Sequence, residues 1–502
     1  MQKDVFYTFF NGVIFGQNQE RLPQLVLKNG EVATEYPRKD AVKCDLRGKT
    51  LMPAFADPHI HLWKVGSLLT HILDVRHCTS IEHIQRKIMQ FDEKNPKNSW
   101  IIARGFNEQN LAEKRFPTSK ELSACSDKKP IFLQRTCAHI AVVNEFALRK
   151  CGITARTPAP QGGKIGYDTY QHPNGVLYET AMALATKHFA PYKQAEYAQM
   201  IRAAQKELLR YGVTAATDPA VSPEILEAYH ALNAKNRLLM QTEAIAICLP
   251  DGENAPFPLP EKYKNGALTV RAVKFFADGG LSGKTAAIST AYKNDPENKG
   301  ILRLDKKQFL ELAQQAHDHG YQIATHAIGD EAIDVVLEIY DKVLKNSGLH
   351  IAHRIEHLGL PNAKQLKKIK ELGIIVVSQP IFINELGDNF LDYLPEKFLT
   401  NEEVYPFKAI LDAQIPLWFS TDAPVVKNLN PFVGIQAALT RQTNSGKLVC
   451  AAQTISLKQA LIAYTAHSNG YIILNKNPYE TPVNELDAIR VEKIVANVPK
   501  LK

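Results

Sequence analysis

The sequence predicts an α/β protein in which helices cover a parallel β-sheet closed into a barrel, with a small β-domain at the N-terminal end. Two observations predict the barrel. An amphipathic helix, a glycine and a short apolar strand follow one another three times, around Gly212, Gly320 and Gly373. Other strand-like runs alternate with these units. Repeated alternation predicts a parallel sheet, and this many units most simply close that sheet into a barrel.

Each of the three glycines lies where a helix is expected to end and a strand to begin. The helices are expected at 197–208, 309–316 and 366–372, and the strands at 213–218, 321–326 and 374–378. Glycine adopts the left-handed conformation after a helix C-cap without steric cost, so a strand can start at once. Further strands are predicted at 238–248, 270–278, 351–358 and 416–420, with a helix at 330–346. An open doubly wound sheet is the alternative, but no G-x-G-x-x-G sequence supports it.

Two parts of the chain depart from this alternation. The first fifty residues contain short β-runs at 5–10, 25–27 and 41–44 separated by polar turns, which favours a small β-domain. Residues 75–205 mix helices with a segment rich in proline and glycine at 157–166. We interpret 75–205 as a long insertion after the first barrel strand, of the kind that roofs an active site.

The composition is that of an ordinary globular protein. Of its 502 residues, 45% are hydrophobic and 22% are charged, and the net charge is +8. No basic run accompanies this excess, so we expect no nucleic-acid partner. The seven cysteines form no C-x-x-C pair, and we interpret them as reduced thiols. The N-terminus lacks the features of a signal peptide and no window is apolar enough to span a membrane, so we expect a cytoplasmic protein.

A group of histidines and one aspartate is expected at the C-terminal ends of separate strands. These residues are His59, His61, His326, His357 and Asp422. The C-terminal rim is where barrel enzymes assemble their sites, so residues distant in sequence meet there. Imidazoles with a carboxylate suit Zn²⁺, with Mn²⁺, Fe²⁺ or Co²⁺ as alternatives. The competing interpretation is that each histidine is an interior residue satisfied by the fold.

Lys274 lies within the apolar run 270–278, where a lysine needs a partner or an altered charge. A neutral amine there can react with CO₂ to form a carbamate, which bridges two cations. The alternative is an ion pair with Asp278 or Asp218. Asp422 can take a proton from a metal-activated water, or it can act as a plain ligand or helix cap.

Several motifs occur in one order along nearly the whole chain. They are Asp57-Pro58-His59-Ile60-His61-Leu62, Arg104-Gly105-Phe106-Asn107, His139 with Asn144, Gly175-Val176-Leu177-Tyr178-Glu179, Gly212-Val213-Thr214 with Asp218, Val273-Lys274-Phe275-Phe276-Ala277-Asp278-Gly279-Gly280, Thr325-His326-Ala327-Ile328-Gly329-Asp330, Arg354-Ile355-Glu356-His357 and Ser420-Thr421-Asp422-Ala423-Pro424. On these motifs the chain resembles the amidohydrolase superfamily. Within it, the chain resembles the amidohydrolase-3 branch, which includes members like N-substituted formamide deformylase and the exoenzyme regulatory protein.

The resemblance implies a (β/α)₈ TIM barrel at 51–468, with the insertion at 75–205, beside a small β-sandwich formed by 1–50 and 469–502. It implies one or two metal ions. Their ligands would be His59, His61, Lys274, His326, His357 and Asp422, with Lys274 as a carboxylated lysine between two ions and Asp422 also as the catalytic base. It places His139, Glu179 and Arg354 in motifs that line the substrate pocket.

Two features of the chain depart from that family pattern. Ala54 stands in the first motif where a glycine is usual, and Ser468-Asn469-Gly470 leads straight into an apolar run where a further helix is usual. The alanine is compatible with the motif unless the backbone there needs a positive φ. The short connection bears on whether the C-terminal strands can complete the small β-domain.

The sequence as a whole predicts a metal-dependent hydrolase that cleaves a C–N bond in a small-molecule amide, N-acyl or N-formyl substrate by metal-activated hydroxide. Two alternatives stay open. One is a non-catalytic regulatory or sensor protein on the same scaffold, because fold does not settle function. The other is a metal-dependent esterase, ring-amide hydrolase or deaminase. A homodimer is compatible with either.

Overall fold

The computed structural model describes residues 6–33, 41–126, 128–160, 162–250 and 255–496. The predicted β-domain at 1–50 and 469–502 and the predicted insertion at 75–205 each include a few residues outside these ranges. Among the helices of the described ranges, none combines the length and apolar character that a membrane crossing requires.

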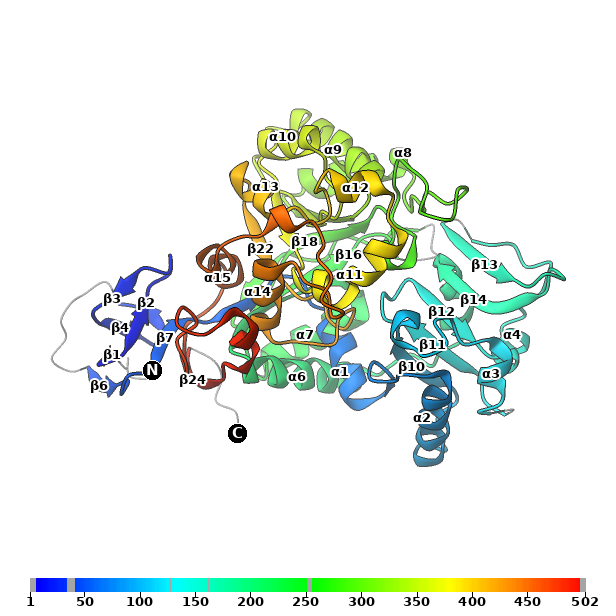
Figure 1. The fold of residues 1–502 in the computed structure, drawn as a ribbon, viewed down its shortest axis with the longest axis horizontal. Coiled ribbons are helices and arrows are strands. Elements are labelled where there is room, and N and C mark those ends of the chain that lie inside the picture. The colour runs from blue at the N-terminus through cyan, green and yellow to red at the C-terminus, as the bar shows by residue number, and fades with distance from the viewer. Residues whose placement is uncertain (1–5, 34–40, 127, 161, 251–254, 497–502) are drawn as a thin grey trace.

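A parallel sheet of eight successive strands forms the centre of the molecule (Figure 1). Its strands are β8 (Phe55–Asp57), β15 (Val213–Val221), β16 (Gln241–Ile247), β18 (Leu268–Phe276), β19 (Gln322–Ala327), β20 (Arg354–His357), β21 (Ile375–Ser378) and β22 (Leu417–Phe419). Each strand pairs with the next one along the chain, and β17 (Tyr263–Asn265) adds antiparallel to β18. Beyond the last and first strands, Asp422 N donates to His59 O at 2.8 Å. The sheet is therefore a nearly closed barrel, and the doubly wound alternative is wrong.

Helices cover the outside of the barrel and connect its strands. They are α1 (Leu62–Thr70), α6 (Gln194–Arg210), α7 (Pro223–Ala234), α8 (Lys306–Asp318), α9 (Asp330–Lys345), α10 (Ala363–Glu371), α11 (Ile381–Tyr393), α12 (Glu396–Thr400), α13 (Phe407–Asp412), α14 (Pro431–Thr440) and α15 (Leu457–Thr465). Gly212, Gly320 and Gly373 have φ of 76°, 74° and 63°. The three predicted helix–glycine–strand units are confirmed as α6–β15, α8–β19 and α10–β21.

Two small sheets at one end of the molecule bring the chain ends together (Figure 1). One sheet contains β1 (Phe6–Phe10), β4 (Leu25–Lys28), β5 (Glu31–Val32) and β6 (Val42–Asp45). The other contains β2 (Val13–Phe15), β3 (Arg21–Leu22), β7 (Thr50–Pro53), β23 (Tyr471–Leu474) and β24 (Val491–Val495). Phe9 and Leu27 from the first sheet share a buried cluster with Leu51 and Tyr471 from the second. The predicted composite of both termini is confirmed.

The two departures from the family pattern lie side by side in this region. Ala54 N donates to Gly470 O at 3.0 Å, so the short connection delivers β23 directly beside β7. Ala54 is fully buried and is not among the residues with positive φ. The alanine therefore needs no strained backbone, and the C-terminal strands complete the sheet without a further helix.

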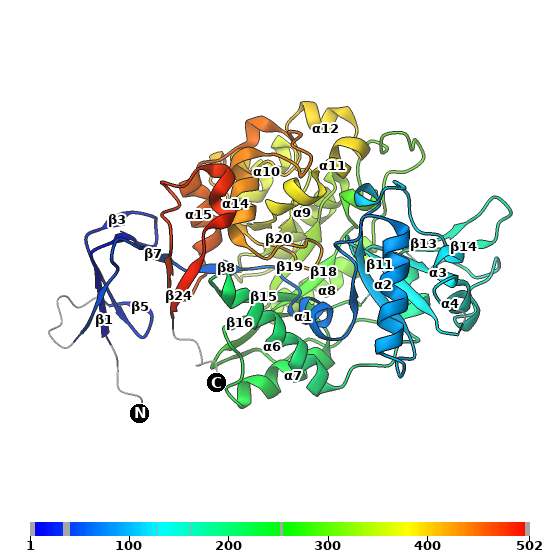
Figure 2. The ribbon, with the colours of Figure 1, turned by 60° about the horizontal axis from the view of Figure 1, so that its bottom comes forward.

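A separate six-stranded sheet follows the first barrel strand and lies at the end of the molecule opposite the terminal sheets (Figures 1 and 2). Its strands are β9 (Leu73–Asp74), β10 (Ile101–Phe106), β11 (Ile131–Arg135), β12 (Ile140–Val143), β13 (Gly163–Tyr167) and β14 (Pro173–Glu179). The helices α2 (Ile81–Lys94), α3 (Ser119–Ser123), α4 (Glu145–Lys150) and α5 (Ala183–Thr186) accompany it. It has buried clusters of its own, separate from the barrel core.

Candidate metal centre

The five predicted side chains converge where the barrel strands end. Donor atoms of His59, His357 and Asp422 all lie within 4.8 Å of one another, and all three residues are buried. His61 Nε2 lies 3.3 Å from Asp422 Oδ1. The ring of His326 lies 4.5 Å from that of His357. The barrel therefore brings together residues from β8, β19, β20 and β22 or directly after them, as the rim argument predicts.

Protein acceptors orient three of these imidazoles. His59 Nδ1 lies 2.5 Å from Glu356 Oε2, His357 Nδ1 lies 2.8 Å from Gln379 Oε1, and His326 Nε2 lies 3.0 Å from Gly279 O. In the neutral form of each ring the acceptor fixes the proton on one nitrogen, so the other nitrogen keeps its lone pair for a cation. Burial also lowers the pKa of His61 and His357 to about 3, so both are neutral at pH 7. Neutral imidazoles are the form that binds metal ions.

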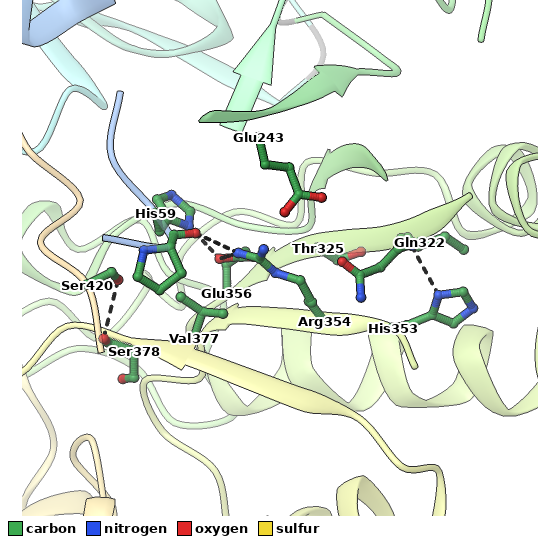
Figure 3. A network of polar contacts seen from close by, with 12 residues as sticks. His59, Glu243, Gln322, Thr325, His353, Arg354, Glu356, Val377, Ser378 and Ser420 are labelled. Atoms are coloured by element: carbon green, nitrogen blue, oxygen red, sulfur yellow. Dashed lines mark hydrogen bonds and ion pairs between the residues drawn. The ribbon is translucent and has the colours of Figure 1, made fainter. Parts of the chain in front are cut away.

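Glu356 is itself held in a buried network (Figure 3). Arg354 Nε donates to Glu356 Oε1 at 2.8 Å, and Arg354 Nη2 donates to Pro58 O at 2.8 Å. Burial raises the pKa of Glu356, but Arg354 and His59 together hold it well below its usual range. Glu356 is therefore a carboxylate that connects Arg354 to the first histidine of the cluster.

Lys274 is fully buried, and its Nζ has no hydrogen-bond partner within the described part of the chain. The two acids considered as its ion-pair partners have other contacts: Asp278 accepts from three backbone amides, and Asp218 accepts from Tyr229 Oη at 2.5 Å. The ion-pair alternative is therefore wrong. Burial lowers the pKa of Lys274 to about 8, although Glu356 and Asp422 act in the opposite direction.

The donor set fits a divalent cation. Besides Lys274 Nζ, the buried atoms His61 Nδ1 and Asp422 Oδ1 have no hydrogen-bond partner among the described residues. Unsatisfied buried polar atoms are rare in proteins and call for an explanation such as an ion. Neutral imidazoles, a carboxylate and an amine of lowered pKa are the ligand types of a zinc-like site. His59, His357 and Asp422 form its central group, with His61 and His326 beside them.

The backbone is unusual at two of these residues. Asp422 has a backbone φ of 57°. His357 has a φ of 74°, and Leu358, the residue after it, has a φ of 50°. Non-glycine residues in this region are uncommon, and such strain concentrates at functional sites. Burial raises the pKa of Asp422, but His59, His61 and His357 hold it well below its usual range. Asp422 is therefore a carboxylate at neutral pH.

A small cavity of about 30 Å³ opens onto the cluster. His139, His326, His357 and Asp422 line it, together with a mainly apolar wall that includes Cys137, Leu281, Ile328, Phe382, Leu386, Phe390, Tyr405 and Val425. Cys137 and His139 lie in the connection between β11 and β12 of the six-stranded sheet, and Phe382, Leu386 and Phe390 come from α11. The segment that carries the six-stranded sheet therefore contributes to the wall of the cavity, which has room for only a water or two.

The three residues predicted to line the substrate pocket lie at different places in the structure. His139 lines the cavity, and Glu179 lies behind it, with Glu179 Oε2 at 2.7 Å from His139 Nδ1. Arg354 instead lines a second cavity of about 260 Å³ with residues from the beginnings of strands, among them Gln241 and Thr269. Glu356 thus separates Arg354 from the histidine cluster.

Three residues of this site were not predicted individually: Glu356, Gln379 and Asp57. Glu356 orients His59, Gln379 orients His357, and Asp57 accepts from Thr421 Oγ1 at 2.5 Å, which ties the end of β8 to the segment that carries Asp422. Glu356 carries the same signal as Lys274, a charged residue in a buried strand. Gln379 has no such signal, because its role depends on a contact between neighbouring strands.

Known proteins similar to this chain agree with the geometry. Residues 44–477 match the sequence profile of the amidohydrolase family. A Bacillus subtilis (strain 168) protein, YtcJ, named as an amidohydrolase, is 26% identical over 495 residues, covering 92% of this chain and 91% of that protein. The N-substituted formamide deformylase of Arthrobacter pascens is 25% identical over 496 residues, covering 90% of this chain and 88% of that protein.

A solved structure extends the likeness to three dimensions. A protein from Pyrococcus horikoshii OT3, described as an uncharacterized metal-dependent hydrolase, superimposes with a TM-score of 0.74 at 26% identity. The match covers 95% of this chain and 99% of that one. The profile match spans most of the sequence, and the barrel carries a histidine and aspartate cluster at its rim. The chain therefore belongs to the amidohydrolase family.

Proposed function

We propose that this protein is a metal-dependent hydrolase that cleaves the C–N bond of a small N-acyl or N-formyl amide. The observation that carries the proposal is the buried group of His59, His357 and Asp422, whose donor atoms lie within 4.8 Å of one another at the barrel rim. The similarity to an N-substituted formamide deformylase supports an amide as the substrate class. Zn²⁺ is the cation that this donor set favours.

His59, His61, His326, His357 and Asp422 would hold the cation. When bound, it polarises the substrate carbonyl and lowers the pKa of water, so that the attacking group is available at neutral pH. Asp422, held as a carboxylate by the surrounding histidines, accepts the proton of the attacking water and delivers it to the departing nitrogen. His139, whose Nδ1 lies 2.7 Å from Glu179 Oε2, lines the same cavity and would contact the substrate there.

Lys274 decides between one ion and two in this proposal. Its buried Nζ without a partner and its lowered pKa favour reaction with CO₂ to a carbamate, whose oxygens would contribute to the site. Elemental analysis gives the number of ions per chain. Carbon NMR of protein equilibrated with ¹³C-bicarbonate gives the carbamate signal directly, and Lys274→Met is its control. A missing carbamate signal together with one ion per chain would contradict the two-ion form.

Asp422 is the residue on which the mechanism depends most. We expect Asp422→Asn to lower kcat by roughly 10²- to 10⁴-fold on N-formyl and N-acyl amines, because proton transfer by a positioned group contributes that much. The metal content of this variant is measured in parallel, since loss of the ion would mimic loss of the base. A metal-replete Asp422→Asn protein with unchanged turnover would refute the role. Stoichiometric metal with no hydrolysis by the wild type would favour a sensor.

A further inference from the structure

The second cavity, of about 260 Å³, lies inside the barrel where several of its strands begin. Residues of β16 and β20 both line it, and β18 and β19 separate these two strands in the sheet, so the cavity extends across the interior. The interior of a closed eight-stranded barrel is normally filled by side chains. Pockets for drug-sized ligands typically measure about 300–1,000 Å³, so this space suits a smaller molecule.

Arg354 presents an unused hydrogen-bond donor at this cavity. It is 1% exposed and lines the cavity. Its Nε and Nη2 donate to Glu356 and Pro58, but its Nη1 has no hydrogen-bond partner within the described ranges. Arg135 and Arg441, which are also buried, use all three guanidinium nitrogens. A buried donor without an acceptor costs free energy, so we expect a ligand in the cavity to supply one.

Glu243 brings a negative charge to the same cavity. Its carboxylate points toward the guanidinium of Arg354 (Figure 3). Glu243 Oε1 accepts from Arg271 Nε at 2.8 Å, and no described residue donates to Oε2. Glu243 and Arg354 form no ion pair with each other, and their partners are Arg271 and Glu356. Opposite charges that line one cavity without touching are complementary to a ligand that carries both charges, and they attract it more strongly than they would in water.

The remaining walls of the second cavity supply a hydroxyl group and an apolar surface. Thr217 is 7% exposed and lines the cavity, and its hydroxyl makes no hydrogen bond to the described residues. Its carbonyl accepts from Ile60 N at 2.9 Å, two residues after Pro58, whose own carbonyl accepts from Arg354. The apolar part of the lining consists of Trp418, Ala56, Pro58, Ala215 and Ala216. The opening to solvent is marked by the exposed lining residues Gln241, Lys264, Arg271 and His467.

We propose that the second cavity is a binding site for a small zwitterion, such as an α-amino acid with an aliphatic side chain. The carboxylate of this ligand accepts from Arg354 Nη1 and from the hydroxyl of Thr217, and its ammonium group donates to Glu243 Oε2. The aliphatic part lies against Trp418, where its burial adds a hydrophobic contribution. None of the five proposed metal ligands lines this cavity, so the site does not depend on the proposed function.

Three matched ligands test the two charges separately. The first is L-leucine, the second is 4-methylpentanoate, which lacks only the ammonium group, and the third is 3-methylbutylamine, which lacks only the carboxylate. We expect calorimetry on the metal-loaded protein to show leucine binding about 10- to 100-fold more tightly than either, because a hydrogen bond between charged groups contributes that much. If leucine does not bind, the cavity holds water only and the proposal is overturned.

Variants locate the bound leucine, which could otherwise chelate the metal ion. Glu243→Gln should weaken leucine binding by roughly tenfold and leave 4-methylpentanoate nearly unchanged, whereas Thr217→Val should weaken both. The matched control is Glu207→Gln on α6, which removes the acid of another partly exposed acid–arginine pair and should change neither. Arg354 is left intact, because its loss would also release Glu356. Undiminished leucine binding in Glu243→Gln would place the ligand elsewhere and overturn the assignment.

Tryptophan fluorescence gives a readout at the cavity itself. Of the three tryptophans of the chain, Trp418 lines the second cavity and Trp63 and Trp100 do not. Leucine should therefore change the emission of the wild type but not that of Trp418→Phe, with the dissociation constant found by calorimetry. The change should persist after a chelator has removed the metal, because no proposed ligand of the ion lines this cavity. A response that disappears with the metal, or that survives in Trp418→Phe, would overturn the proposal.

Discussion

His59 lies between two acids that have different tasks. Glu356 holds Nδ1 at 2.5 Å, and Asp422 Oδ1 lies 3.4 Å from Nε2 on the cation side. Glu356 is in turn held by Arg354, so a buried guanidinium sets the orientation of an imidazole it does not touch. Partners of this kind fix ring orientation and raise ligand basicity. Arg354 therefore acts on the metal centre through Glu356, and this role does not depend on any contact with a substrate.

Replacing Glu356 by Gln tests this chain of contacts. The amide still offers His59 an acceptor, but Arg354 loses its carboxylate. We expect metal affinity to fall about 10- to 100-fold and the free energy of unfolding to fall by about 3–5 kcal/mol. Competition with a chelator measures the first quantity and urea unfolding the second. Glu338→Gln, at an exposed position on α9, is the control. Unchanged metal affinity would contradict the role of Glu356.

At the scale of elements, close packing of α1 on α6 holds the first two histidines in place. α1 begins directly after His61, which is its N-cap residue. A Cβ at Gly66 would lie 1.8 Å from Met200 O on α6, so the two helices approach too closely for any side chain there. The position of the His59 and His61 segment thus depends on a helix contact made by a glycine.

We expect Gly66→Ala to reduce the free energy of unfolding by about 3 kcal/mol, the upper range for overpacking, because the atom that the new methyl group meets is backbone. It should also reduce metal affinity, since α1 must shift. Gly348→Ala is the matched control: it has open space and no positive φ, and should be neutral or slightly stabilising. Thermal and urea unfolding of both variants decide the point, and equal stabilities would be evidence against the helix contact.

At the scale of the whole molecule, the terminal sheet and the barrel share one core. Ile472 on β23 is fully buried and belongs to the same cluster as the barrel side chains. It pairs with Met52 on β7, the strand that leads into β8 and the first histidines. The C-terminal strand β23 therefore supports the segment that enters the metal centre, although the two lie far apart along the sequence.

We expect Ile472→Ala to destabilise the barrel as well as the terminal sheet, by about 2–5 kcal/mol, because it leaves a cavity in their shared core. Limited proteolysis should show earlier cleavage in both regions. Lys493→Ala, at an exposed position of β24, is the control. Faster cleavage confined to the terminal strands would show that the barrel is stable without this contact.

Local patterns in the sequence were sufficient to predict the barrel and its rim. Amphipathic periods of helices and single glycines such as Gly320 are properties of short segments, and they place His326 and His357 at strand ends without knowledge of the fold. The same reasoning identified Lys274 as a lysine within an apolar strand. The closure of the sheet followed from the number of these units.

The tertiary structure decided how these side chains are partnered. No local feature of the sequence predicts that Glu356 contacts His59 or that Gln379 contacts His357. Nor does one predict that Lys274 lacks the ion pair considered for it. Whether a buried polar group has a partner depends on contacts between separate segments, 297 residues apart for His59 and Glu356 and 22 for His357 and Gln379, and these contacts exist only after the barrel has closed.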